Sequence, residues 1–325
     1  AGSFVEEYMT HSLVGIGFRD GALHVIGTPH DDFVTIDNKH GSYVVHASFP
    51  VNLPYGPSQS DAILASHFRY DIRTHIVDSF VVDLGDGSDR LTSSRNVSVP
   101  VTAYGGANDD TLIVSGGPAI LFGQDGNDYL QGGPSQDWLD GGDHDDRLSS
   151  LGADDYLTGG RGIDELDGGA GDDTADHGDG QDQFVGGSQP SRDMLIVNVN
   201  DALLDLANDF TDDLFSFEGI DLRDAVGTKL HVTPQAVIDA TPSRNQVFLH
   251  VSDYAVVDLD LAWDLVTTSL TDGMYTRSYQ SGPAQLEIAG PIDSTNPVNP
   301  LDVNGDQRQT AVDALQVINE ISRGN

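Results

Sequence analysis

Apolar residues recur at a fixed interval of nine in the middle of the chain. From Gly105 to Val185 the sequence divides into nine nonapeptides without an insertion. The eighth position of every nonapeptide is apolar: Leu112, Leu121, Leu130, Leu139, Leu148, Leu157, Leu166, Ala175 and Phe184. Positions one, two and four are rich in Gly. The pattern predicts a Gly-rich turn followed by a short strand, repeated as a solenoid.

The sixth position of the nonapeptide is acidic in eight of the nine copies. If two nonapeptides make one coil, these Asp residues form two columns. One column contains Asp110, Asp128, Asp146, Asp164 and Asp182, and the other contains Asp137, Asp155 and Asp173 after an interruption at Ala119. The four gaps of the first column and the two of the second predict six places where carboxylates from stacked turns meet.

The best copies are Gly123–Leu130, Gly159–Leu166 and Gly168–Asp173. They resemble the RTX (hemolysin-type) repeat, Gly-Gly-x-Gly-x-Asp-x-U-x, where U is a large apolar residue. The resemblance implies a parallel β-roll that binds about six Ca²⁺ ions between adjacent turns, through Asp carboxylates and main-chain carbonyls. Four copies depart from Gly at position four, and we expect weaker turns there: Asn108, Ser135, His144 and Ala153.

Calcium is expected to drive folding of residues 105–185. Each nonapeptide buries only one large apolar side chain, about 1.5–3 kcal/mol, which does not offset the backbone entropy of the whole nonapeptide. Stacking also brings like-charged carboxylates together, with a repulsion on the order of 3 kcal/mol per pair. A divalent ion converts that repulsion into attraction, so binding free energy becomes folding free energy.

The composition of the 325-residue chain agrees with a cation-dependent fold. There are 52 Asp and Glu against 15 Lys and Arg, a formal charge of −37, which excludes nucleic acid as an expected partner. The chain has no Cys, so disulfides are excluded, and no apolar run is long enough for a transmembrane segment. It starts without Met, and we expect a processed or partial piece.

The flanks of the roll predict further β structure. Residues 1–104 contain alternating runs at 22–26, 33–36, 42–47 and 75–84 and read as an irregular β-rich cap with degenerate repeat turns at Gly27–Val34 and Gly85–Leu91. The roll is expected over 105–198, because the register of nine slips after Val185. Residues 199–290 predict a β-rich domain, with strands in 246–261 and 274–288 and turns or short helices at 211–221 and 233–239, and 291–300 a linker. The predicted fold is mainly β, with a parallel β-roll and a short EF-hand-like loop and helix at the C-terminus.

That last segment, residues 301–325, carries a second calcium motif. Asp302, Asn304, Asp306 and Asp313 occupy positions 1, 3, 5 and 12 of a twelve-residue loop, in which Arg308 would offer its backbone carbonyl. Apolar residues then recur at helical spacing. The segment resembles one half of a type I dockerin, which implies one further Ca²⁺ and a cohesin-like protein partner.

No catalytic constellation is present in the chain, since both His-Glu-x-x-His and Gly-x-Ser-x-Gly are absent. We therefore expect a non-enzymatic calcium-binding protein, secreted or attached to the cell surface, of bacterial type and with an adhesin-like or matrix role. The alternative is the accessory portion of a larger exported hydrolase. A third hypothesis is binding of extracellular polysaccharide, because Trp138 and Tyr156 share position seven and lie one coil apart.

Overall fold

Short strands separated by tight turns make up almost all of the computed structural model. It describes residues 15–51, 64–176, 178–180, 182–187, 193–197, 203–205, 214–215, 219–223, 227–240, 246–251, 256–259, 262–271 and 274–291. The chain divides into two compact units, Ala1–Gly133 and Pro134–Asn325. The boundary falls inside the nonapeptide array, and each unit is described by itself.

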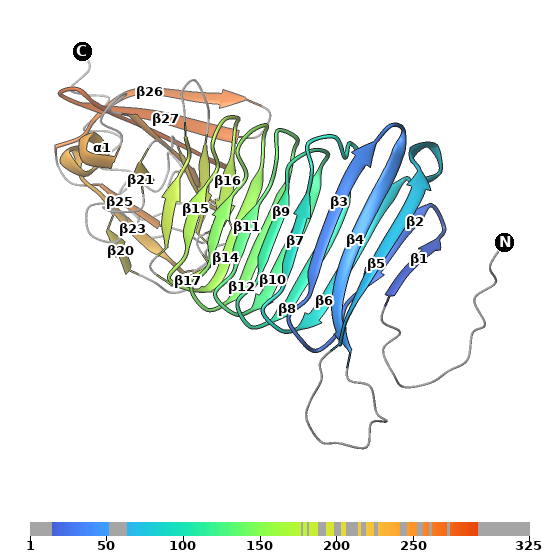
Figure 1. Cartoon of the computed structure of the whole chain (residues 1–325). Coiled ribbons are helices and arrows are strands. Elements are labelled where there is room, and N and C mark those ends of the chain that lie inside the picture. The colour runs from blue at the N-terminus through green and yellow to red at the C-terminus, as the bar shows by residue number, and fades with distance from the viewer. Residues whose placement is uncertain are drawn as a thin grey trace, which may run out of the picture. The chain divides into compact units, whose positions relative to one another are not determined.

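The first unit consists of two sheets of mostly parallel strands, drawn in blue to green in Figure 1. One sheet has the order β1 (Gly15–Arg19), β2 (Ala22–Ile26), β6 (Ser79–Asp86), β8 (Val101–Ala107), β10 (Ala119–Asp125). The other has the order β11 (Tyr129–Gln131), β9 (Thr111–Val114), β7 (Arg90–Ser93), β3 (Phe33–Lys39), β4 (Ser42–Val51), β5 (Leu64–Arg73). A 3₁₀ turn, Thr74–Ile76, precedes β6.

The strand register of the first unit follows the coil of two nonapeptides. Leu130 pairs with Leu112, and Leu121 pairs with Ala103, so the apolar eighth positions stack on one another. These side chains are fully buried. The alternation of apolar and polar residues along each strand puts one face inside and the other outside.

The N-terminal region continues the same parallel stack. β2 pairs with β6, β6 with β8, and β3 with β7, all in parallel. Three strands break the pattern, because β1, β4 and β5 pair antiparallel with their neighbours. β4 and β5 are the longest strands and form the end of their sheet (Figure 1).

The second unit continues with the same kind of coil. In one sheet β12 (Trp138–Asp143), β14 (Tyr156–Gly162) and β16 (Thr174–Asp176) are parallel neighbours, and β17 (Asp179–Gly180) also pairs with β14. In the other sheet the order is β13 (Arg147–Ser149), β15 (Glu165–Asp167), β18 (Gln183–Val185), β21 (Leu214–Phe215). Leu139, Leu148, Leu157 and Leu166 are buried, as the period of nine predicts.

Parallel stacking continues past Val185, where the register of nine is lost. β19 (Met194–Ile196) pairs with β16 and puts Leu195 beside Ala175. β22 (Gly219–Leu222), β24 (Gln246–Val251) and β28 (Ala284–Pro291) then follow in the same sheet, all parallel. The slip of two residues therefore lies between two strands of the same stack.

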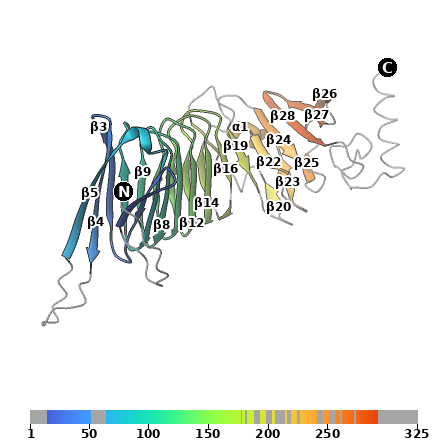
Figure 2. The same cartoon turned by 90° about the vertical axis from the view of Figure 1, so that its right-hand side faces the viewer.

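The remaining elements of the second unit pack beside these strands. A third sheet has the order β20 (Leu203–Asp205), β23 (Lys229–Val232), β25 (Val256–Leu259). β26 (Asp264–Thr271) and β27 (Met274–Ser281) join β28 as an antiparallel meander. The predicted turn or helix at 233–239 is a helix, α1 (Pro234–Ala240), which contacts β24 and β28 (Figure 2).

The prediction of a mainly β fold with a parallel roll is confirmed. The C-terminal loop and helix lie outside the described residues. Among the helices of the described part of the chain, none is both long and apolar enough to cross a membrane.

Candidate metal centre in the stacked turns

The sixth position of each nonapeptide ends a turn, directly before the short strand. All eight Asp side chains predicted as ligands in the array are buried, with no residue more than 4% exposed: Asp110, Asp128, Asp137, Asp146, Asp155, Asp164, Asp173 and Asp182. Burying an ionised carboxylate is costly unless a counter-charge accompanies it. The turns therefore need a source of positive charge.

In most of these turns one carboxylate oxygen accepts a hydrogen bond from the neighbouring turn. The Asp110 N–H donates to Oδ1 of Asp128 over 2.7 Å, 18 residues further on. The same bond links Asp146 to Asp164, Asp164 to Asp182, Asp137 to Asp155 and Asp155 to Asp173, over 2.7–3.0 Å. Within each compact unit the structure thus brings together the Asp pairs that the coil of two nonapeptides predicts.

The second oxygen is left without a partner in several turns. Oδ2 of Asp110, Asp155, Asp164 and Asp173 is buried and accepts no hydrogen bond from the described residues. A buried acceptor without a partner costs about 1–3 kcal/mol. Four such oxygens in equivalent positions fit the binding of the same kind of ligand in all of these turns.

Main-chain carbonyls are directed into the same gaps, and they explain the Gly at positions one, two and four. A Cβ on Gly105 would overlap Oδ2 of Asp110 and lie 2.8 Å from the carbonyl oxygen of Gly123 in the next turn. At position two, a Cβ on Gly160 would overlap the Gly142 carbonyl. At position four, a Cβ on Gly162 would overlap the His144 carbonyl.

Three of the four non-Gly residues at position four are accommodated by the backbone. Asn108, His144 and Ala153 have φ angles of 78°, 86° and 91°, in the left-handed region that side chains disfavour. Each is followed one coil later by a Gly with φ between 148° and 154°: Gly126, Gly162 and Gly171. The expected weakness of these turns is thus the conformational cost of a positive φ at a non-Gly residue. The turn one coil later avoids this cost because it has Gly at the same position.

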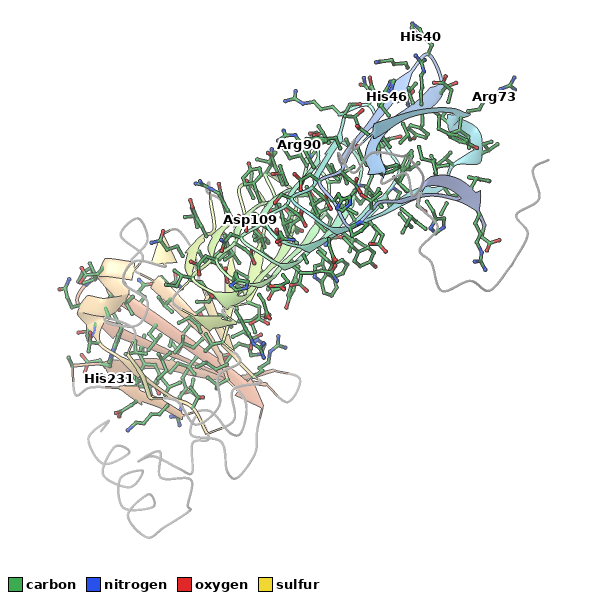
Figure 3. The ribbon with its side chains drawn as sticks, turned by 60° about the horizontal axis from the view of Figure 1, so that its bottom comes forward. His40, His46, Arg73, Arg90, Asp109 and His231 are labelled. Atoms are coloured by element: carbon green, nitrogen blue, oxygen red, sulfur yellow. The ribbon has the colours of Figure 1, made fainter. Side chains whose placement is uncertain are left out.

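Exposed carboxylates at position five also join successive turns. Oδ1 of Asp109, Asp145 and Asp154, at position five, accepts the N–H of the residue 18 positions later over 2.9 Å. Asp109 lies on the outside of the roll (Figure 3). The nonapeptide consensus leaves position five open, so the sequence pattern did not predict these contacts.

Burial sets the protonation of the Asp side chains at position six. It raises the pKa of Asp110 and Asp155 to about 8 and that of Asp164 and Asp173 to about 6, and nearby Asp carboxylates contribute to each rise. Without a cation, these carboxyls therefore hold protons far above the usual pH range of Asp. A divalent ion between turns favours the ionised form and displaces those protons.

The donors in these gaps fit calcium. Carboxylate and carbonyl oxygens are the ligands that Ca²⁺ prefers, and it accepts six to eight of them in irregular geometry. No group of three or more His, Cys, Asp or Glu side chains suited to a metal ion occurs in the described parts of the chain. Two carboxylates at most border a gap, so main-chain oxygens must supply the remaining ligands.

Comparison with protein families agrees with this chemistry. Residues 122–156 and 150–184 match the RTX calcium-binding nonapeptide repeat (4 copies). The resemblance inferred from the repeat is thus confirmed for this part, and the chain contains RTX calcium-binding repeats. No curated protein matches the chain.

The other predicted sites have different outcomes. Asp302, Asn304, Asp306, Arg308 and Asp313 lie outside the described residues, so the dockerin-like loop stays a prediction. Trp138 and Tyr156 are neighbours as predicted, with ring centroids 5.1 Å apart and planes at 58°. Asp32, Asp89 and Asp193 lie outside the array and also join the columns. The sequence signal for each is the degenerate repeat turn in which it lies.

Proposed function

We propose that the chain is a secreted or cell-surface protein whose roll, residues 105–198, folds when it binds about six Ca²⁺ ions. The observation that carries this proposal is the set of buried Oδ2 atoms without partners, each in a gap that carbonyls also line. Asp110, Asp128, Asp146, Asp164 and Asp182 serve one column, and Asp137, Asp155 and Asp173 the other. The match to calcium-binding repeats over 122–184 supports the choice of ion.

The biological role that follows is mechanical. A roll that is stiff only with calcium is disordered where calcium is scarce and folds where it is abundant, which suits a protein that is exported before it folds. An adhesin-like or matrix role follows on this basis. The same property suits the accessory portion of an exported hydrolase, and sequence beyond residues 1 and 325 would separate these two roles.

A calcium titration of the full chain tests the proposal. Isothermal calorimetry should show several ions bound per chain, and far-UV circular dichroism should show β content that rises with calcium and falls again with EGTA. Magnesium at the same concentration is the control, because it demands a stricter octahedral geometry. Equal β content in EGTA and in millimolar calcium would contradict the proposal.

The partner of the protein is a separate question. Trp138 is 49% exposed, but it packs at an angle against Tyr156, and the two rings do not form one flat surface for a sugar. A cohesin-like partner depends on the C-terminal loop. Pull-down with a purified cohesin, using the chain with and without residues 301–325, is the direct test of that partner.

A further inference from the structure

The nonapeptide Leu84–Thr92 lies outside the nine-repeat array, yet its Asp89 continues the column that contains Asp110. The Asp89 N–H donates to Oδ1 of Asp110 over 2.7 Å, the same bond that links turns within the array. Only the spacing differs, 21 residues in place of 18. The strands behind the two turns are parallel and in register, with Leu91 beside Leu112.

The gap between these turns has the donors of an array gap. Asp89 is 3% exposed, and its Oδ2 is buried without a hydrogen-bond partner in the described structure. The Gly85 carbonyl is directed at Gly106 so closely that a Cβ there would overlap it. Asp89 forms no ion pair with any described residue, and the neighbouring Arg90 is exposed on the outside (Figure 3).

One turn earlier the carboxylate is satisfied by protein groups. The Asp32 N–H donates to Oδ1 of Asp89 over 2.6 Å, so the column continues. Oδ2 of Asp32, however, accepts the Thr28 N–H over 2.5 Å, and Oδ1 accepts the Thr28 hydroxyl over 2.9 Å. Thr28 thus occupies the position where the other turns leave an oxygen unsatisfied.

The second column is extended at its other end. The Asp173 N–H donates to Oδ1 of Asp193 over 2.9 Å, although the two residues are 20 positions apart in place of 18. Oδ2 of Asp173 has no hydrogen-bond partner among the described residues. The Gly169 carbonyl is directed at Gly187, where a Cβ would overlap it. The described residues of this gap therefore offer the same kinds of oxygen as an array gap.

We propose that calcium binds one gap beyond the regular array in each column, at Asp89–Asp110 and at Asp173–Asp193, and that binding stops at Asp32 because Thr28 replaces the ion. The inference rests on the proposed function. It extends calcium dependence to β6 and β7 on the N-terminal side and to β19 on the C-terminal side. The six expected ions of the roll become eight, six plus these two.

Calcium stoichiometry of the full chain tests the two gaps. Equilibrium dialysis against ⁴⁵Ca²⁺ should show that Asp89→Asn and Asp193→Asn each bind one ion fewer than the wild type. Asparagine keeps an oxygen for the N–H of the preceding turn. Asp32→Asn is the matched control and should bind as many ions as the wild type, and Asp155→Asn, inside the array, should lose at least one.

The outcomes separate the two proposals. No calcium bound to the wild type would overturn the proposed function itself. Loss of ions in Asp155→Asn with none lost in Asp89→Asn and Asp193→Asn would overturn the extension alone, and a loss in Asp32→Asn would show that Thr28 does not replace the ion. If a variant fails to fold, native mass spectrometry counts the ions on a chain that carries Asp302→Ala, a substitution that removes the predicted C-terminal loop site. Eight bound ions support the two additional gaps, and six contradict them.

Discussion

Two buried carboxylates of the second unit are neutralised in different ways. Asp155 lies in the array, and no Arg or Lys of the described structure pairs with it. Asp221, on β22 in the same sheet as β14, is 6% exposed and is held by Arg223, whose Nε lies 2.9 and 2.8 Å from the two carboxylate oxygens. A guanidinium two residues away supplies the charge that the array must take from outside.

We therefore expect one stack to contain both a calcium-dependent and a calcium-independent part. Where Arg223 neutralises Asp221, folding needs only apolar burial, which Ile220, Leu249 and Leu286 provide at adjacent strands. In the array, apolar burial is equally complete but sparse along the chain, and the carboxylates repel one another. The array should therefore unfold in EGTA while the strands from β22 to β28 stay folded.

The largest expected effect comes from core leucines in the two parts. Leu157→Ala and Leu249→Ala each remove a fully buried side chain and should cost about 2–5 kcal/mol of the free energy of unfolding. Leu157→Ala should lower protection from hydrogen exchange in calcium only, because we propose that the array unfolds without calcium. Leu249→Ala should lower protection both in calcium and in EGTA. An effect of Leu157→Ala in EGTA equal to that in calcium would remove the distinction.

A smaller effect is expected when the internal counter-charge is removed. Arg223→Gln leaves Asp221 buried with fewer hydrogen bonds and should cost about 1–3 kcal/mol, with or without calcium, measured by hydrogen exchange of residues 219–251. Arg161→Gln is the matched control. Arg161 pairs with an exposed Asp143, so its loss should cost about 0–1 kcal/mol. Equal costs for the two variants would show that Asp221 does not depend on Arg223.

The last effect is a pH dependence that is confined to the array and is expected without calcium. The folded pKa of Asp110 and of Asp155 is raised to about 8, while the unfolded value stays near 4. The folded state therefore binds more protons between these values, and calcium-free stability is greatest below about pH 4 and falls as pH rises through 8. Each such carboxyl changes the free energy of unfolding by at most about 1.4 kcal/mol per pH unit.

Circular dichroism of calcium-free protein should accordingly show more β structure at pH 5 than at pH 8. With calcium the trend reverses, because protons compete with the ion and a lower pH weakens binding. The midpoint of a calcium titration should therefore lie at a higher calcium concentration at pH 5 than at pH 8. A calcium-free protein with more β structure at pH 8 would contradict this assignment of protonated carboxyls.

The core residues and the Asp pairs could be predicted from the sequence where the repeat is regular. The period of nine located the buried leucines, such as Leu130 and Leu157, and paired Asp137 with Asp155 from spacing alone. It also located strands outside the array, including β2 at 22–26 and β24 from residue 246. Both predictions depend only on local alternation or a fixed spacing, which the printed sequence contains in full.

The stacking of turns could not be predicted where insertions change the spacing between them. β4 and β5 separate Asp32 from Asp89 along the chain, and two extra residues after Val185 put Asp193 out of the register of nine. A fixed period cannot predict that such turns stack. Their motifs were visible as degenerate fragments, but a fragment alone does not specify which other turn it contacts.

The chemistry of this protein can be predicted from its residues: the repeat of Gly, Asp and Leu makes each coil, and the excess of carboxylates favours a cation. The carboxylates that such a cation would bind follow from the three-dimensional stacking of the turns. Whether a buried Asp meets another turn, a Thr28 hydroxyl or an Arg223 guanidinium depends on how the strands stack. The physical reason is that charge neutralisation acts across a few ångströms of space, between groups that can be far apart along the chain.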